Sequence, residues 1–302
     1  MRDKLPLSRK YRPESFEDML GNVDELESLK QTVQEGKVTT FLLYGDRGCG
    51  KTTSARIIAK EKGIKAGIKE YNISNTTGID AARGIIDDCR YMGLDGNCII
   101  LNEIQRASVG FQNAILEILE EPPKGTYFIL CTTNPEKLLA PVKSRCSKFR
   151  FSPLSLVMGR KFIKKILTQE NQELDKELIT GIVKKTEGIP REILVLLDKV
   201  LKIKPEKRAK IIENYIGGEV TEEIRTLCQM LLKKNQWKSI AKVLKHIKGE
   251  PENIRRAILA YAGTVLLNSG NIQAAVIIET FQENFYDSGK AGLYFACFSC
   301  VN

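Results

Sequence analysis

A run of eight residues in the first fifth of the chain has the types and order that bind a triphosphate: Gly45-Asp46-Arg47-Gly48-Cys49-Gly50-Lys51-Thr52. It fits the pattern G-x-x-x-x-G-K-[ST]. Backbone N–H groups of such a loop, with the positive end of the following helix, form a concave anion site that extends to Thr53. We expect Lys51 to neutralise the β- and γ-phosphates and the Thr52 hydroxyl to hold Mg²⁺. The alternative is a glycine-rich turn that binds nothing.

A strand-like run further along the chain ends in polar residues. Cys98–Leu101 is followed by Asn102 and Glu103, where P-loop ATPases usually carry Asp-Glu. We expect Glu103 to act as the base that polarises the attacking water. Asn102 accepts hydrogen bonds from metal-bound water but carries no charge, so we expect weakened Mg²⁺ binding. The alternative is a plain buried strand followed by an acidic helix start.

Three more positions are candidates for contact with the transferred phosphate. Thr133, directly after the apolar run 127–132, is predicted to orient water, although Thr-Thr-Asn is also an ordinary turn signal. Arg145 is predicted to enter the site of a neighbouring subunit, and a surface ion pair is the alternative. Arg191 is predicted to reach the nucleotide from a second domain or to cap its own helix.

Strand-like and helix-like segments alternate over the first half of the chain. The predicted strands are 40–44, 69–73, 98–101, 127–132 and 148–151, and the predicted helices are 23–35, 53–62, 79–90 and 110–121. Short apolar strands alternating with helices predict an α/β domain with a mostly parallel sheet covered on both faces.

The second half of the chain is predicted to be helical. Three or four short helices are expected over 154–216, and Gly217-Gly218 is a candidate hinge. Apolar residues at helical spacing then continue from Ile254 to Val265. The predicted domains are a nucleotide-binding domain (1–152), a helical lid (153–218) and a helical collar (219–302).

Composition narrows the class of protein. The chain has 302 residues, of which 42% are hydrophobic and 28% charged, as in ordinary globular proteins. No apolar run approaches the ~20 residues of a membrane span and no secretory signal opens the chain, so we expect a cytoplasmic protein with no membrane partner. Scattered cysteines favour a reducing compartment. The net charge of +10 permits phosphate-backbone binding without requiring it.

Taken together, the motifs resemble those of clamp-loader AAA+ ATPases, in particular the gamma/tau subunit of bacterial DNA polymerase III and the small subunits of replication factor C. The segments that carry the resemblance are Arg9–Phe16 with Leu20-Gly21-Asn22, Asn72–Asn75 with Gly78-Ile79-Asp80 and Arg83, Leu119–Pro123, Ser144-Arg145-Cys146, and Phe285–Lys290. Of these, Ser-Arg-Cys is nearly diagnostic of clamp loaders. The similarity extends over essentially the whole chain.

The resemblance implies a role for each of these segments. ATP and Mg²⁺ would be the cofactors, and the opening segment with Arg12, Pro13 and Leu20 would wrap the adenine. Arg191 would occupy the sensor-2 position of the lid. Arg83 and Arg106 would face duplex DNA and touch phosphates, and Gln112 would couple DNA binding to the ATP site. For Arg83, a solvated helix face is an equal alternative.

The function implied is an ATPase subunit that loads a sliding clamp onto primer-template DNA. Its partners would be the clamp, the DNA and other subunits in a ring, expected to be a pentamer. A non-hydrolysing structural subunit of the same ring is the rival, because Asn102 departs from the family. Another AAA+ DNA-remodelling ATPase, such as a helicase loader or a branch-migration motor, fits the P-loop but not Ser-Arg-Cys or the collar.

Two further features separate the chain from gamma/tau. That family usually inserts a four-cysteine zinc module after the P-loop helix, whereas residues 52–88 contain no cysteine, so no zinc is expected. We interpret Cys297 and Cys300, a lone C-x-x-C, as one face of a helix. Length alone predicts a compact loader, and leaves open whether a phage or its host encodes it.

Overall fold

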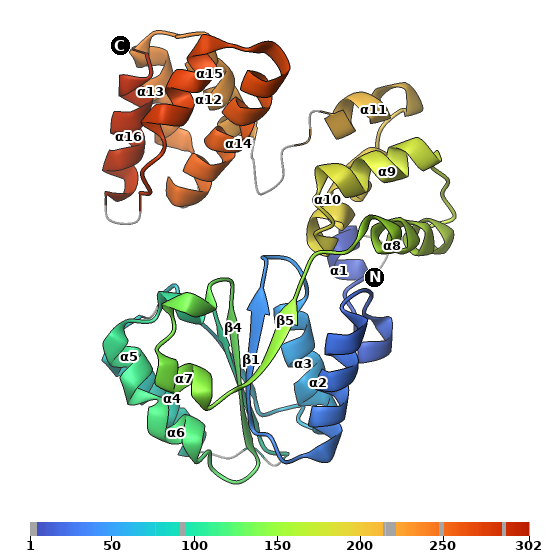
Figure 1. The fold of residues 1–302 in the computed structure, drawn as a ribbon, viewed down its shortest axis with the longest axis vertical. Coiled ribbons are helices and arrows are strands. Elements are labelled where there is room, and N and C mark those ends of the chain that lie inside the picture. Colours follow the sequence, from blue (N-terminus) through green and yellow to red (C-terminus); the bar gives the residue numbers. More distant parts are fainter. Residues whose placement is uncertain are drawn as a thin grey trace. The chain divides into compact units, whose positions relative to one another are not determined.

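In the computed structural model the described residues are 5–75, 77–90, 93, 95–213, 215, 222–247, 251–285 and 288–301. The chain divides into two compact units, Met1–Ile212 and Glu213–Asn302 (Figure 1). The candidate hinge Gly217-Gly218 and residues 286–287 lie outside the described residues. Among the helices that are described, none combines the length and hydropathy needed to cross a bilayer.

The first unit contains a five-stranded sheet in the order β2-β3-β4-β1-β5, and every neighbouring pair is parallel. Its strands are β1 (Thr40–Gly45), β2 (Ile68–Asn72), β3 (Asn97–Asn102), β4 (Thr126–Thr132) and β5 (Ser147–Phe151). The parallel α/β sheet predicted from the sequence is confirmed. Because Asn72 pairs with Asn102, and Asn102 with Cys131, the carboxyl ends of β2, β3 and β4 meet at one edge.

Helices cover both faces of this sheet (Figure 1). On one face lie α2 (Val23–Glu35) and α3 (Lys51–Glu61), and on the other α4 (Ile79–Arg90), α5 (Val109–Ala114), α6 (Leu116–Glu120) and α7 (Ala140–Ser144). Successive residues of a strand point to opposite faces of the sheet, and each face packs in its own apolar core. Phe41 and Leu43 lie in one core and Leu42 in the other. The helix predicted over 110–121 is interrupted at Ile115, whose ψ of −5° departs from helical values.

Four helices follow the sheet in the same unit: α8 (Leu156–Gln169), α9 (Lys176–Lys185), α10 (Pro190–Leu201) and α11 (Pro205–Glu213). The Ser155 hydroxyl caps α8 by accepting the N–H of Met158 at 3.3 Å. Helices α8 and α9 pack closely, because a Cβ added to Gly159 would lie 2.6 Å from Val183. The short helix α1 (Leu7–Lys10) contacts α10. A boundary between sheet and lid at residue 152 remains our prediction.

The second unit is helical in its described residues. It comprises α12 (Glu222–Leu232), α13 (Trp237–His246), α14 (Pro251–Ser269), α15 (Ile272–Thr280) and α16 (Gly289–Ser299), which share one apolar core. Cys297 and Cys300 are both buried in that core, as the helix-face interpretation requires. Burial raises the pKa of both thiols.

A buried ion pair joins α14 to the segment that follows α15. Glu252 contacts Arg255 at 2.8 Å and accepts the N–H of Phe285 at 3.0 Å, and Arg255 also donates to the carbonyl of Phe281 at 2.7 Å. Burial opposes ionisation of Glu252, but the hydrogen bonds from Arg255 and Phe285 lower its pKa to about 2. The pair therefore stays charged inside this unit.

We predict that Arg255→Gln destabilises the second unit by about 3 kcal/mol, because it leaves the buried carboxylate of Glu252 without its main partner. Arg256 contacts the same carboxylate at 3.1 Å from an exposed position, so Arg256→Gln is the matched control and should cost less than about 1 kcal/mol. Urea denaturation of both variants measures the difference. Equal losses would contradict a special role for the buried pair.

Candidate nucleotide-binding site

The P-loop connects β1 to α3 and its backbone requires glycine. Gly45 has φ of 131°, and a Cβ there would lie 2.0 Å from the carbonyl oxygen of Phe151 on β5. Gly50, with φ of 106°, is the N-cap of α3, whose first turn has no acidic residue. The positive end of the helix therefore faces the loop without a competing carboxylate.

The other loop residues lie around this cradle. Asp46 and Arg47 form its exposed tip, Cys49 is buried, and Thr53 is half-buried in the first turn of α3. Burial raises the pKa of the Cys49 thiol to about 11, so this side chain contributes packing rather than charge.

Lys51 is held directly over the loop. Its Nζ donates to the carbonyls of Gly45 and Asp46, both at 2.8 Å, and the residue is 8% exposed. Burial lowers its pKa. An anionic phosphate at this point would stabilise the buried ammonium, so the environment of Lys51 fits its predicted role.

Further cations gather near the loop. Partial burial lowers the pKa of Arg12, and the positive charges of Arg56 and Arg191 lower it further, so these guanidinium groups are close enough to repel one another. A polyanion such as a triphosphate would relieve that repulsion.

A chain of hydrogen bonds runs from the P-loop helix across two strands. Thr52 Oγ1 donates to Asn102 Oδ1 at 2.7 Å, and Asn102 Nδ2 donates to Glu70 Oε1 at 2.8 Å. Glu70 Oε2 accepts from Arg56 Nη2 at 2.7 Å and from its Nε at 3.0 Å. The two predicted metal-site residues, Thr52 and Asn102, are thus in direct contact, and Glu70 is an addition that the sequence did not indicate.

Glu103 directly follows β3 in the left-handed region, with φ of 56° and ψ of 38°. This conformation is unfavourable for glutamate, and such strain clusters at functional sites. Its carboxylate accepts from Gln105 Nε2 at 2.6 Å, and the same amide donates to Thr133 Oγ1 at 3.0 Å. Gln105 therefore bridges the predicted base and the predicted water-orienting residue. The position of Gln105 in the sequence, two residues after Glu103, could have identified it as a candidate site residue.

The N-terminal segment runs beside the loop. A Cβ on Gly50 would lie 2.9 Å from the methyl group of Met19, next to half-buried Leu20. Asn22 exchanges two hydrogen bonds with the backbone of Ser152, at 2.9 and 3.0 Å, which ties this segment to the end of β5. Arg12 and Pro13 line a hollow of about 350 Å³ together with α3.

The start of α10 also touches the loop. The N–H of Arg191 points to the carbonyl of Gly48 at 3.4 Å, and a Cβ on Gly48 would lie 3.1 Å from Cβ of Arg191. The backbone of Arg191 is therefore beside the loop, and its predicted contact with the nucleotide remains a prediction.

Arg145 is held on the other face of the sheet. Its Nε and Nη2 contact Glu120 on α6 at 2.9 and 2.5 Å, and its Nη1 donates to the carbonyl of Pro141 at 3.1 Å. This contact is the ion pair stated above as the alternative. Glu120 has 60% of its side chain exposed, so a neighbour's phosphate could replace it as partner of Arg145.

The candidate DNA-contacting residues differ in exposure. Arg83 on α4 is exposed and pairs with Asp80 at 3.2 Å, and Arg106 is exposed on the short turn after β3. Gln112 is only 3% exposed. Its amide NH₂ donates to the carbonyl of Lys137 at 3.3 Å, and its amide oxygen accepts the N–H of Leu139 at 2.8 Å. In this conformation Gln112 can affect DNA binding only through the loops that it joins.

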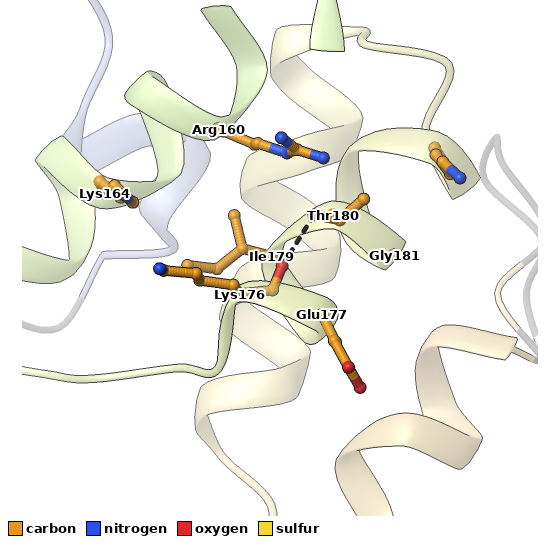
Figure 2. A pocket seen from close by; sticks show the side chains of 8 residues that line it. Arg160, Lys164, Lys176, Glu177, Ile179, Thr180 and Gly181 are labelled. Atoms are coloured by element: carbon orange, nitrogen blue, oxygen red, sulfur yellow. Dashed lines mark hydrogen bonds between the residues drawn. The ribbon is translucent and has the colours of Figure 1, made fainter. Parts of the chain in front are cut away.

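A larger hollow lies away from all these residues, between α8 and α9 (Figure 2). It measures about 690 Å³, and its lining includes the long basic side chains of Arg160, Lys164 and Lys176. None of the predicted site residues lines it. Size alone would therefore have pointed away from the predicted nucleotide site.

Comparison with known proteins shows which families this chain is similar to. The DNA polymerase III delta subunit family matches residues 61–155. The DNA polymerase III subunit gamma of Buchnera aphidicola is 28% identical over 255 residues, covering 76% of this chain and 69% of that protein. Replication factor C subunit 3 of Blastobotrys adeninivorans is 28% identical and covers 82% and 75%. By these similarities the chain is related to clamp-loader AAA+ ATPases, namely the DNA polymerase III gamma and replication factor C subunits.

Other relatives are much longer than this chain. The tau subunit of DNA polymerase III from Bacillus subtilis is 30% identical over 222 residues, covering 65% of this chain but 39% of that protein. Among solved structures, the RuvB Holliday junction branch migration motor of Thermotoga maritima is 20% identical, with a TM-score of 0.58 over 78% of this chain and 85% of that one. That similarity confirms the AAA+ fold.

Proposed function

We propose that this clamp-loader chain is an ATPase subunit that uses ATP to load a sliding clamp onto primer-template DNA. The observation that carries the proposal is the joining of a P-loop, a metal-site pair and a strained glutamate at one edge of the sheet. Its partners would be the clamp, the DNA and other subunits in a ring, which we expect to be pentameric. A reducing cytoplasm suits its eight free, buried cysteines.

The residues present fit a nucleotide-bound Mg²⁺. The Thr52 hydroxyl and the Asn102 amide oxygen, 2.7 Å apart, are the oxygen ligands that this ion prefers. When bound, Mg²⁺ supplies positive charge to the β- and γ-phosphate oxygens. Lys51 would bind the same phosphates from the loop side, and Arg191 would approach them from α10.

Residues of the chain itself would position and activate the attacking water. Glu103 would accept a proton from the attacking water at its carboxylate. Gln105 would hold Glu103 and Thr133 in one hydrogen-bonded group, so that base and water-orienting hydroxyl stay in register. Arg145 of a neighbouring subunit would stabilise charge on the transferred phosphoryl group.

The test of this proposal is ATP hydrolysis measured with and without primed DNA and the clamp of the same replication system. A clamp-loading ATPase should hydrolyse ATP slowly alone and faster with both partners. A rate that neither partner changes would favour another AAA+ activity. The absence of hydrolysis with normal ATP binding would favour the structural-subunit alternative, to which Asn102 points.

Asn102→Asp should lower the Mg²⁺ concentration needed for half-maximal hydrolysis. The substitution adds a negative charge beside the Thr52 hydroxyl and places it against the carboxylate of Glu70, a repulsion that a bound cation relieves. Titrating Mg²⁺ at saturating ATP measures the shift. An unchanged titration curve would mean that position 102 does not address the metal.

DNA binding should be independent of sequence and steeply salt-dependent, because the contacts are expected on phosphates. Replacing both Arg83 and Arg106 by glutamine should reduce the slope of log K against log salt by about two. Lys161 and Lys165, exposed on α8, provide a control that removes the same charge. A strong base preference with a shallow salt slope would contradict this mode of binding.

A further inference from the structure

Glu70 occupies a place in the site that the phosphate-binding motifs do not explain. It lies on β2, two residues before the strand ends, and its side chain is 32% exposed. Through Asn102 it is connected to Thr52, the first metal-site residue of the P-loop helix, by hydrogen bonds of 2.8 and 2.7 Å. The carboxylate that is hydrogen-bonded to Asn102 therefore comes from β2, whereas Asn102 itself lies at the end of β3.

The direction of these hydrogen bonds is fixed by chemistry. An ionised carboxylate only accepts, so the group of Asn102 that faces Glu70 must be the amide NH₂. The oxygen of Asn102 must then face Thr52, where the metal would bind. Without Glu70 the amide of Asn102 could turn over, because the Thr52 hydroxyl accepts a hydrogen bond as readily as it donates one. The group facing Thr52 and the metal position would then be NH₂, which cannot bind a cation.

Glu70 is itself held in position from α3. Arg56 lies one helical turn after Thr52 and donates twice to Oε2 of Glu70, at 2.7 and 3.0 Å. This leaves Oε1 for Asn102. The hydrogen bonds therefore run from Arg56 through Glu70 and Asn102 to Thr52, and both ends of this series lie on the P-loop helix α3.

We propose that Glu70 is a metal-positioning residue. It holds the amide oxygen of Asn102 toward the Mg²⁺ that accompanies the nucleotide, and it supplies, one hydrogen bond further out, the negative charge that asparagine lacks. The inference rests on the proposed nucleotide-binding function. Removal of a carboxylate that orients a metal ligand typically weakens metal affinity by about 10- to 100-fold.

The test uses Mn²⁺ as a substitute for Mg²⁺ and measures free Mn²⁺ by electron paramagnetic resonance in the presence of the ADP-bound chain. Glu70→Gln should weaken Mn²⁺ binding by about tenfold or more. ADP affinity measured in a metal chelator should stay unchanged. Glu27→Gln, on the exposed face of α2, removes the same charge elsewhere and should alter neither quantity.

A second variant exchanges the two side-chain types. In Glu70→Gln combined with Asn102→Asp, the glutamine amide donates to the introduced carboxylate, so the hydrogen bond is kept with reversed direction. A carboxylate has oxygen on both sides and needs no orientation. Relative to Asn102→Asp alone, the added Glu70→Gln should therefore cost clearly less Mn²⁺ affinity than it costs in the unsubstituted chain, whereas a role of Glu70 unrelated to Asn102 predicts equal losses in both backgrounds.

The possible results distinguish a failure of the role proposed for Glu70 from a failure of the proposed nucleotide-binding function. Normal Mn²⁺ affinity in Glu70→Gln, with normal ADP affinity, would overturn the role of Glu70 and leave the proposed function intact. If the single variant fails to fold, a folded double variant that binds Mn²⁺ at least about tenfold more weakly than Asn102→Asp overturns the inference. Failure of the unsubstituted chain to bind any nucleotide would overturn the proposed function itself.

Discussion

Replacing Arg145 by alanine is expected to slow ATP hydrolysis by about 10³-fold or more while leaving ATP affinity nearly unchanged. The physical reason is that its guanidinium contacts Glu120 and Pro141 of its own chain, whereas its proposed target is the phosphoryl group in a neighbour's site. Single-turnover hydrolysis measures the chemical step and calorimetry measures the affinity. Glu120→Gln is the control, because it breaks the same ion pair but keeps the guanidinium.

Mixing experiments distinguish action in trans from action within one chain. Combining Arg145→Ala chains with Glu103→Gln chains should restore hydrolysis at interfaces where an intact Glu103 meets an intact Arg145. Size measurements must confirm that subunits of the two kinds exchange. If they exchange without any recovery, Arg145 is a structural arginine and the structural-subunit alternative becomes the better account.

Lys51→Ala is expected to weaken ATP binding at least about tenfold, or about 1.4 kcal/mol. Lys51 is the buried ammonium over the loop, held by the carbonyls of Gly45 and Asp46, and its desolvated charge is best compensated by phosphate oxygens. Calorimetric titration with ATP measures the loss, and Lys37→Ala, at an exposed position, is the control. Unchanged affinity would remove the P-loop interpretation.

The fold was predictable because its signals are local. The strands 40–44, 98–101 and 127–132 are short apolar runs bounded by polar residues, and the structure extends each by one or two residues only. Helix 23–35 matches α2 at both ends. The P-loop also could be located, since its glycine pattern appears in one continuous segment.

The fine structure of the site was not predictable because it depends on strand order and register. Nothing in the local sequence of β2 says that it lies beside β3, so the contact of Glu70 with Asn102 becomes visible only once Asn72 is paired with Asn102. The burial of Gln112 likewise depends on two loops far apart in sequence. The family resemblance indicated its position but not its contacts.

Clamp loading itself is measured as the retention of a labelled clamp on primed circular DNA, with the chain assembled with its partner subunits. The account predicts that the clamp stays on the DNA through gel filtration when ATP is present, and that Lys51→Ala abolishes this retention. Equal retention with and without ATP, or no retention although the assembled ring binds ATP and DNA, would contradict it.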